Sequence, residues 1–245
     1  MKKLLLVLFI FVICNSFAVA QSEATYKSFM DACYKGDINL VKAFIESGIN
    51  VNNELGGETA LYYAVAGGQL VVVRELIKAK ADVNAGLDKP LLLASTVGSS
   101  KIAQELINAK ADVNFQNAYG VTALLLASQG GYLNLVQILI RAGADLNLHA
   151  KNGGTPLMKA AEFGHVEIIQ ELTEAGADIN IQNNEGFTAL MIAAENGQPN
   201  VVNYLVNAGA KTEIKNNKGD TASFLALRKG HKEIFDILQD TDSKQ

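Results

Sequence analysis

The three histidines and Cys33, which is one of two cysteines, are the residues best suited to metal or nucleophilic chemistry in this chain. His149, His165 and His231 lie far apart, and no two of them have the spacing of zinc ligands. Neither C-x-x-C nor H-E-x-x-H occurs. Cys33 has no histidine near it in sequence, and the equivalent positions further along the chain hold small residues or valine. We therefore expect Cys33 to fill a small core position, and we predict no metal site and no catalytic nucleophile.

Carboxylates and glycines could support two further kinds of chemistry. Glu162 and Glu195 are 33 residues apart, so they could lie on neighbouring structural units and share acid–base work. We favour a solvated acidic surface instead. The 21 glycines form neither G-x-G-x-x-G nor G-x-x-x-x-G-K-[ST], the loops that cradle phosphates. The sequence therefore predicts no enzyme activity and no cofactor.

One twelve-residue pattern recurs at intervals of 33 residues. It reads GVTALLLASQGG from Gly120, GGTPLMKAAEFG from Gly153 and GFTALMIAAENG from Gly186. An asparagine ends successive copies, at Asn52, Asn84, Asn114, Asn147 and Asn180, and Glu213 takes its place in the next. A period of this length indicates stacked supersecondary units, each of which buries its apolar face against its neighbours.

Each copy predicts two helices. A threonine side chain can satisfy the free amides where the first helix opens, at Thr59, Thr122, Thr155, Thr188 and Thr221. Glycine tolerates the left-handed conformation that ends a helix and follows the first helix at Gly36, Gly68, Gly98, Gly131, Gly164, Gly197 and Gly230. Apolar pairs four residues apart give the second helix one apolar face. We expect an all-α repeat solenoid of about seven repeats.

The pattern G-x-T-A-L-x-x-A-A-x-x-G, followed by a helix ending in G-A-D-x-N, resembles the ankyrin repeat family. The resemblance implies two antiparallel helices and a short β-hairpin loop per repeat, stacked into a curved solenoid. The expected repeats are 26–52, 53–84, 85–114, 115–147, 148–180, 181–213 and 214–240, with a short segment at 21–25 and a tail at 241–245.

The chain departs from the family at one position. The family's usual histidine after T-P-L is replaced by Tyr62, Leu92, Leu125, Met158, Met191 and Phe224. Its hydrogen bonds must therefore be absent or made by other groups. His165 and His231 follow the helix-ending glycine, at a position that is structural in the family.

The third copy is irregular. It is 30 residues long, and Lys89 stands where threonine would cap the first helix. Lys80 and Lys110 occupy positions where glycine ends the second helix in other copies, and a left-handed lysine costs about 1 kcal/mol or more. We favour a shortened hairpin with tolerated drift; a local break in curvature that shapes a binding surface is the alternative.

Residues 1–20 have the character of a secretory signal peptide. Lys2 and Lys3 precede an unbroken apolar run at 4–13, and Ala18 and Ala20 form an A-x-A cleavage site. The apolar run is shorter than the ~20 residues that span a bilayer, which disfavours a membrane anchor. The bulky Ile13 precedes Cys14, which disfavours a lipoprotein acylated at that cysteine. Removing two lysines from 21 basic residues leaves 19 against 25 acidic residues, a net charge of −6. We therefore predict that the mature chain binds neither nucleic acid nor membrane.

The family's partner-binding positions are the hairpin tips and the end of the first helix. In copies four to six we select eight of them, which we call the aromatic–acidic patch: Tyr119, Val121, Glu162, Phe163, Glu185, Phe187, Glu195 and Asn196. Exposed aromatic side chains ringed by charge are typical interface anchors, although Phe187 could instead pack on the neighbouring hairpin. The acidic rim favours a partner protein with a basic patch.

The resemblance implies a non-enzymatic protein–protein interaction scaffold that binds its partner through the concave surface. With the signal peptide, we expect an exported and most simply periplasmic protein. The alternative is a secreted effector that binds host proteins, which would be found in the culture medium.

Overall fold

The computed structural model describes residues 22–87 and 89–242. The chain divides into two compact units between Asp112 and Val113, here called unit 1 and unit 2. The predicted signal peptide at 1–20 lies outside the described residues. Within the described ranges, no helix is both long enough and apolar enough to cross a bilayer.

The described part of unit 1 contains three helix pairs and one β-hairpin. Its elements are α2 (Glu23–Lys35), α3 (Ile38–Glu46), β1 (Glu54–Leu55), β2 (Glu58–Thr59), α4 (Ala60–Ala66), α5 (Leu70–Lys78), α6 (Pro90–Thr96) and α7 (Ser100–Asn108). The strands are antiparallel, with Leu55 opposite Glu58. Within unit 1, each helix packs on its pair partner and on the equivalent helix of a neighbouring pair.

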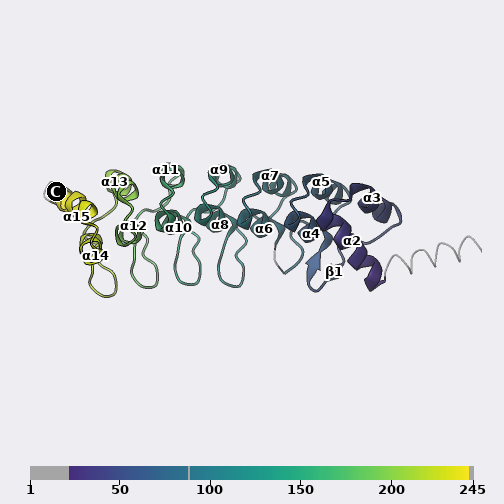
Figure 1. The fold of residues 1–245 in the computed structure, drawn as a ribbon, viewed down its shortest axis with the longest axis horizontal. Coiled ribbons are helices and arrows are strands. Elements are labelled where there is room, and N and C mark those ends of the chain that lie inside the picture. Colours follow the sequence, from purple (N-terminus) through teal and green to yellow (C-terminus); the bar gives the residue numbers. More distant parts are fainter. Residues whose placement is uncertain (1–21, 88, 243–245) are drawn as a thin grey trace, which may run out of the picture. The chain divides into compact units, whose positions relative to one another are not determined.

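Unit 2 contains four helix pairs. They are α8 (Ala123–Gln129) with α9 (Leu133–Arg141), α10 (Pro156–Phe163) with α11 (Val166–Glu174), α12 (Ala189–Glu195) with α13 (Pro199–Asn207), and α14 (Ala222–Lys229) with α15 (Lys232–Asp242). The first helices pack side by side in one row and the second helices in another. In Figure 1, α9, α11 and α13 lie above α8, α10 and α12, and the loops extend below.

The first and last helices of the described chain extend beyond residues 26 and 240. Helix α2 begins at Glu23, within the segment predicted to precede the repeats, because Ser22 caps it by accepting a hydrogen bond from the amide of Thr25 at 3.2 Å. Helix α15 continues to Asp242, two residues into the predicted tail.

Threonine caps start the first helices, as the sequence predicted. The hydroxyl oxygen accepts a hydrogen bond from the amide three residues later, for example from Leu125 to Thr122 at 3.1 Å and from Met158 to Thr155 at 3.2 Å. Lys89, at the start of α6, makes no such cap. Its ammonium instead donates to the carbonyl oxygens of Asn84 at 2.5 Å and Gly86 at 3.0 Å, which closes the shortened loop.

The recurring asparagines connect consecutive helix pairs within each unit. Each side-chain oxygen accepts a hydrogen bond of 2.7–3.0 Å from a backbone amide of the following copy, and the acceptors are Asn52, Asn84, Asn114, Asn147 and Asn180. The side-chain amides of the first three also donate to a backbone carbonyl of that copy. The amide side chain can bond to both backbone groups at once, which explains why asparagine recurs there.

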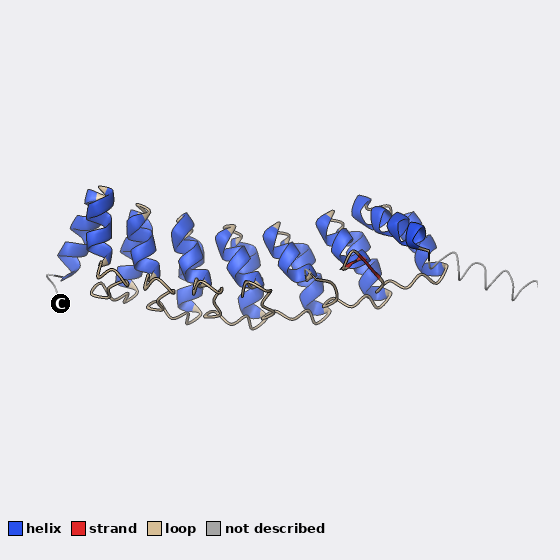
Figure 2. Ribbon diagram, turned by 90° about the horizontal axis from the view of Figure 1, so that it is seen from below, coloured by secondary structure: helices blue, strands red, loops and turns tan. Residues whose placement is uncertain are grey.

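The loops of unit 2 reverse direction without forming strands; in the described part of the chain, only β1 and β2 are strands (Figure 2). Asn117, Asn183 and Asn216 hold these loops, because each side-chain oxygen accepts two backbone amides of its own loop tip. A side chain therefore supplies the bonds that a longer strand ladder would make. Successive tips are also joined, for instance by the amide of Asn217 donating to the carbonyl of Glu185 at 3.0 Å.

Candidate protein-binding surface

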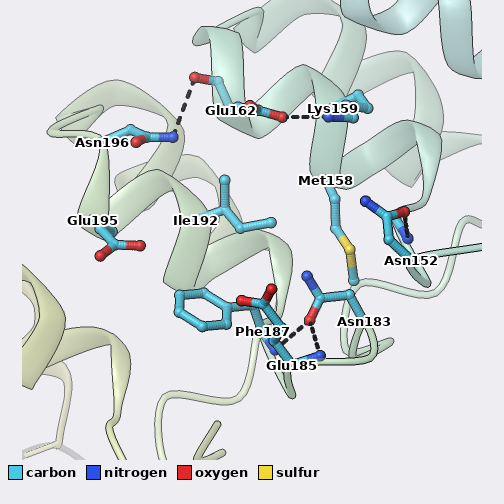
Figure 3. A pocket seen from close by; sticks show the side chains of 11 residues that line it. Asn152, Met158, Lys159, Glu162, Asn183, Glu185, Phe187, Ile192, Glu195 and Asn196 are labelled. Atoms are coloured by element: carbon cyan, nitrogen blue, oxygen red, sulfur yellow. Dashed lines mark hydrogen bonds and ion pairs between the residues drawn. The ribbon is translucent and has the colours of Figure 1, made fainter.

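A pocket of about 290 Å³ lies between α10, α12 and their preceding loops in unit 2, and we call it the α10–α12 pocket. Figure 3 shows its lining side chains. They are Asn152, Gly154, Met158, Lys159, Glu162, Asn183, Glu185, Phe187, Ile192, Glu195 and Asn196. The structure therefore brings together five of the eight residues of the predicted aromatic–acidic patch.

The loop tip positions two of these residues directly. The side-chain oxygen of Asn183 accepts hydrogen bonds from the amides of Glu185 at 3.0 Å and Phe187 at 2.8 Å. Phe187 and Ile192 lie next to each other in the pocket, and Met158 faces them from α10 (Figure 3). These three side chains give the pocket an apolar part that a large side chain of a partner could cover.

Two of the three predicted acidic residues are neutralised by cations of the same surface. Glu162 is paired with Lys159 at 2.7 Å. Glu195 lies 3.3 Å from Arg228 and 3.5 Å from Lys229. Glu185 is exposed and has no ion-pair partner within residues 22–87 and 89–242. Among these three carboxylates, the negative charge available to a partner is therefore concentrated at Glu185. The predicted acidic rim included all three.

Tyr119 and Val121 line a second, adjacent pocket of about 330 Å³ between α8 and α10. This α8–α10 pocket shares Asn152 and Lys159 with the α10–α12 pocket. Tyr119 is 72% exposed, and its carbonyl accepts a hydrogen bond from the amide of Lys151 at 2.9 Å. The two pockets therefore form one continuous strip along the loops and first helices of unit 2.

Phe163 is the exception in the predicted patch. It is 49% exposed, lines neither pocket of the strip, and stacks on His165 with ring centroids 6.2 Å apart. Successive residues of an α-helix point about 100° apart. The side chain of Phe163 therefore points in a different direction from that of Glu162, toward His165. Its place in the aromatic–acidic patch stays a prediction.

Sequence reasoning missed the residues in the middle of the first helices. Lys159 and Ile192 both line the α10–α12 pocket, and both stand four residues after the threonine that opens their helix. The sequence contains this signal, because one turn separates this position from the end of the helix. The family's partner-binding positions, at the hairpin tips and the helix ends, do not include this position.

The histidines and the cysteine have structural surroundings. The ring of His165 is hydrogen-bonded to the carbonyl of Gln129 at 3.2 Å, and that of His231 to the carbonyl of Glu195 at 3.1 Å. Burial raises the pKa of the Cys33 thiol to about 12, so the reactive thiolate is scarce at neutral pH. Among the residues that the structure covers, no three histidine, cysteine or acidic side chains are placed to hold a metal ion.

Comparison with known proteins identifies the family. No match was found among curated proteins. A family described as ankyrin repeats (3 copies) matches residues 11–87, 29–117, 91–183 and 170–245. These matches cover nearly the whole sequence and agree with the paired helices and their intervening loops. The chain belongs to the ankyrin repeat family, whose repeats form protein–protein interaction scaffolds.

Proposed function

We propose that this protein is a non-catalytic scaffold that binds a partner protein through the loops and first helices of unit 2. The α10–α12 pocket carries this proposal, because it combines the apolar side chains of Phe187 and Ile192 with the unpaired carboxylate of Glu185. A partner segment that fits would present a large apolar side chain beside a lysine or arginine. Family membership supports the choice of a protein as ligand, since ankyrin repeat proteins are typically non-enzymatic.

Ion pairs at the rim set the specificity of the proposed site. A basic side chain can approach Glu185 without displacing an existing cation, whereas at Glu162 it would compete with Lys159. Exposed ion pairs are worth about 0–1 kcal/mol, so a contact with Glu185 alone would contribute little to the binding free energy. The charge of Glu185 then acts mainly on the association rate and on the choice of partner.

Site-specific photo-crosslinking in cells tests this proposal. A benzoylphenylalanine at position 187 should form a light-dependent adduct with one partner protein, which mass spectrometry would identify. The same residue at position 200, on the exposed side of α13, should not. Equal adducts at both positions, or an adduct at position 200 alone, would place the interaction elsewhere.

We also propose that the chain is exported and acts in the periplasm. The charged start, apolar run and A-x-A site of residues 1–20 support this. Cell fractionation with N-terminal sequencing should find a protein that begins at Gln21 in the periplasmic fraction. The same protein in the culture medium would favour the secreted effector, and a cytoplasmic protein retaining Met1 would refute export.

A further inference from the structure

A pocket in unit 1 has a different chemical character from the surface of unit 2. It has a volume of about 400 Å³ and is lined by α2, β1 and α4 through Lys27, Met30, Asp31, Tyr34, Leu55, Tyr62, Tyr63 and Ala66. Three of the seven tyrosines of the chain meet here, and we call it the tyrosine pocket. We infer that it is a second binding site, which takes a large apolar side chain from a polypeptide segment bearing an adjacent carboxylate.

The pocket exists because of the residue types on α2 and α4. Ala66 ends α4 at the position where the first helices of unit 2 carry Gln129, Glu162, Glu195 and Arg228. The short alanine side chain leaves open the space that those longer chains would occupy. Tyr62 and Tyr63 meet edge to face, with centroids 5.7 Å apart at 85°, and so form two walls at right angles.

The lining predicts an apolar anchor. Met30 and Leu55 are apolar, and Tyr34, which is 51% exposed, adds an aromatic surface at the entrance. Tyrosine-rich pockets are frequent anchor points at protein interfaces because they bury much apolar area while the hydroxyl groups stay near water. The volume lies in the range of about 300–1,000 Å³ that is usual for ligand pockets.

The charged side chains at the rim determine which residue of the partner segment would lie next to the apolar anchor. Asp31 is paired with Lys35 at 2.7 Å, so its carboxylate is already compensated. Lys27 is exposed and has no ion-pair partner in the part of the chain that the structure describes. The free charge at the rim is therefore positive, the reverse of the free negative charge of Glu185 in unit 2. A carboxylate beside the anchor could pair with Lys27 without displacing another group.

The openness of the pocket favours a polypeptide over a small molecule. Lys27, Asp31 and Tyr34 are all exposed, so a compact ligand would keep much of its surface in water. Sites for small molecules usually bury 70–90% of the ligand, roughly speaking. A peptide segment that inserts one side chain and continues across the rim loses nothing from this openness. The tyrosine pocket shares no lining residue with the two pockets of unit 2, and its assignment does not require the proposed site there.

Peptide selection on the purified protein tests the inference. Random phage-displayed peptides should yield sequences with a large apolar residue within about three positions of aspartate or glutamate, the reach of neighbouring side chains. Synthetic versions should bind Tyr34→Ser and Lys27→Glu at least about tenfold more weakly than the wild type, as expected for an anchor and a charge contact. Val71→Ser, which removes an exposed apolar side chain on α5 away from the pocket, is the control and should bind normally.

Several results would overturn the inference. They are the absence of enriched peptides, unchanged binding by both unit 1 variants with circular dichroism equal to the wild type, and unchanged binding when the acidic residue of the peptide becomes asparagine. Tight binding of p-cresol that excludes the peptides would replace the polypeptide by a small aromatic ligand. Tyr34→Phe keeps the ring and should retain binding. Loss of binding in this variant would mean that the hydroxyl, not the apolar surface, is recognised.

Discussion

Lys80 and Lys110 are the two residues other than glycine with positive φ in the described part of the chain, at 69° and 72°. The sequence predicted this, because glycine stands at the equivalent positions of other copies. A side chain in this conformation is strained by contact between Cβ and the following carbonyl. Both carbonyl oxygens accept hydrogen bonds from the asparagines of the preceding copy, so the conformation is held by bonds between copies.

Replacing Lys80 by glycine should therefore stabilise the protein. We expect Lys80→Gly to raise the free energy of unfolding by about 1 kcal/mol, the strain of one left-handed residue. Lys78→Gly, in the last turn of α5, is the control and should lower it by about 0.5–1 kcal/mol. Urea denaturation measures both. Equal destabilisation by the two substitutions would show that position 80 is not strained.

The buried thiol of Cys33 should be unreactive in the folded protein. Burial raises its pKa from 9.0 to about 12, so the protonated form dominates at pH 8. In a Cys14→Ser variant, iodoacetamide should modify Cys33 only after urea unfolds the chain. The pKa of this thiol is higher in the folded chain than in the unfolded chain. Its contribution to the free energy of unfolding is therefore complete below pH 9 and is lost as the pH rises toward 12. Rapid alkylation of the native protein would contradict this placement.

The packing of each helix depends on its apolar face, and the conformation of each loop depends on the residues at its tip. The second helices bury residues such as Val136 and Leu139 completely, as the four-residue spacing predicted. The loop tips approach the backbone of the next tip so closely that only glycine fits at some positions. The helix faces therefore contribute to stability alone, whereas the loop tips contribute to both stability and site geometry.

Truncating a buried leucine should be costly. Leu139→Ala on α9 should lower the free energy of unfolding by about 2–5 kcal/mol, the usual range for a core cavity. Asn134→Ala, an exposed change on the same helix, should alter it by less than about 0.5 kcal/mol. Thermal or urea unfolding measures both changes. A loss below about 0.5 kcal/mol for Leu139→Ala would contradict its core position.

Gly186 is required by both its conformation and its surroundings. Its φ is +81°, and an added Cβ would lie 2.7 Å from the backbone nitrogen of Asn217. Gly219 has a similar φ of +83° but no atom within 4 Å of the same position. Gly186→Ala should therefore destabilise the protein more than Gly219→Ala, by about 1 kcal/mol or more for the clash alone. Equal unfolding midpoints would show that the two tips are not in close contact.

The helix pairs, the threonine caps and the left-handed lysines could be predicted because each follows from a local pattern that repeats. The balance of charge around the pocket could not. Glu195 is neutralised by Arg228 and Lys229 from the next helix pair, and that pairing depends on side-chain reach across copies. The stacking of Phe163 on His165 could not be predicted either, because it depends on the orientation of both side chains. The number of repeats and their boundaries stay predictions.

At the scale of the whole molecule, the two units offer opposite free charges. Unit 1 presents Lys27 beside the tyrosine pocket, and unit 2 presents Glu185 beside Phe187 and Ile192. A single stacked architecture can produce such different sites, because residues on the loops and first helices vary while the buried positions repeat. In our proposal, the repeated fold determines how partners are held, and the varying residues around these pockets determine which partners bind.

Binding of a partner protein at the α10–α12 pocket is tested most directly by the affinity of the crosslinked partner for two charge-reversed variants. Glu185→Lys at the pocket and Glu174→Lys at the end of α11 change the net charge equally, and both residues are exposed. Calorimetry should show that Glu185→Lys weakens binding by about tenfold or more, whereas Glu174→Lys leaves it within about twofold. Equal effects of the two substitutions would mean that the partner responds to overall charge and does not bind at the α10–α12 pocket.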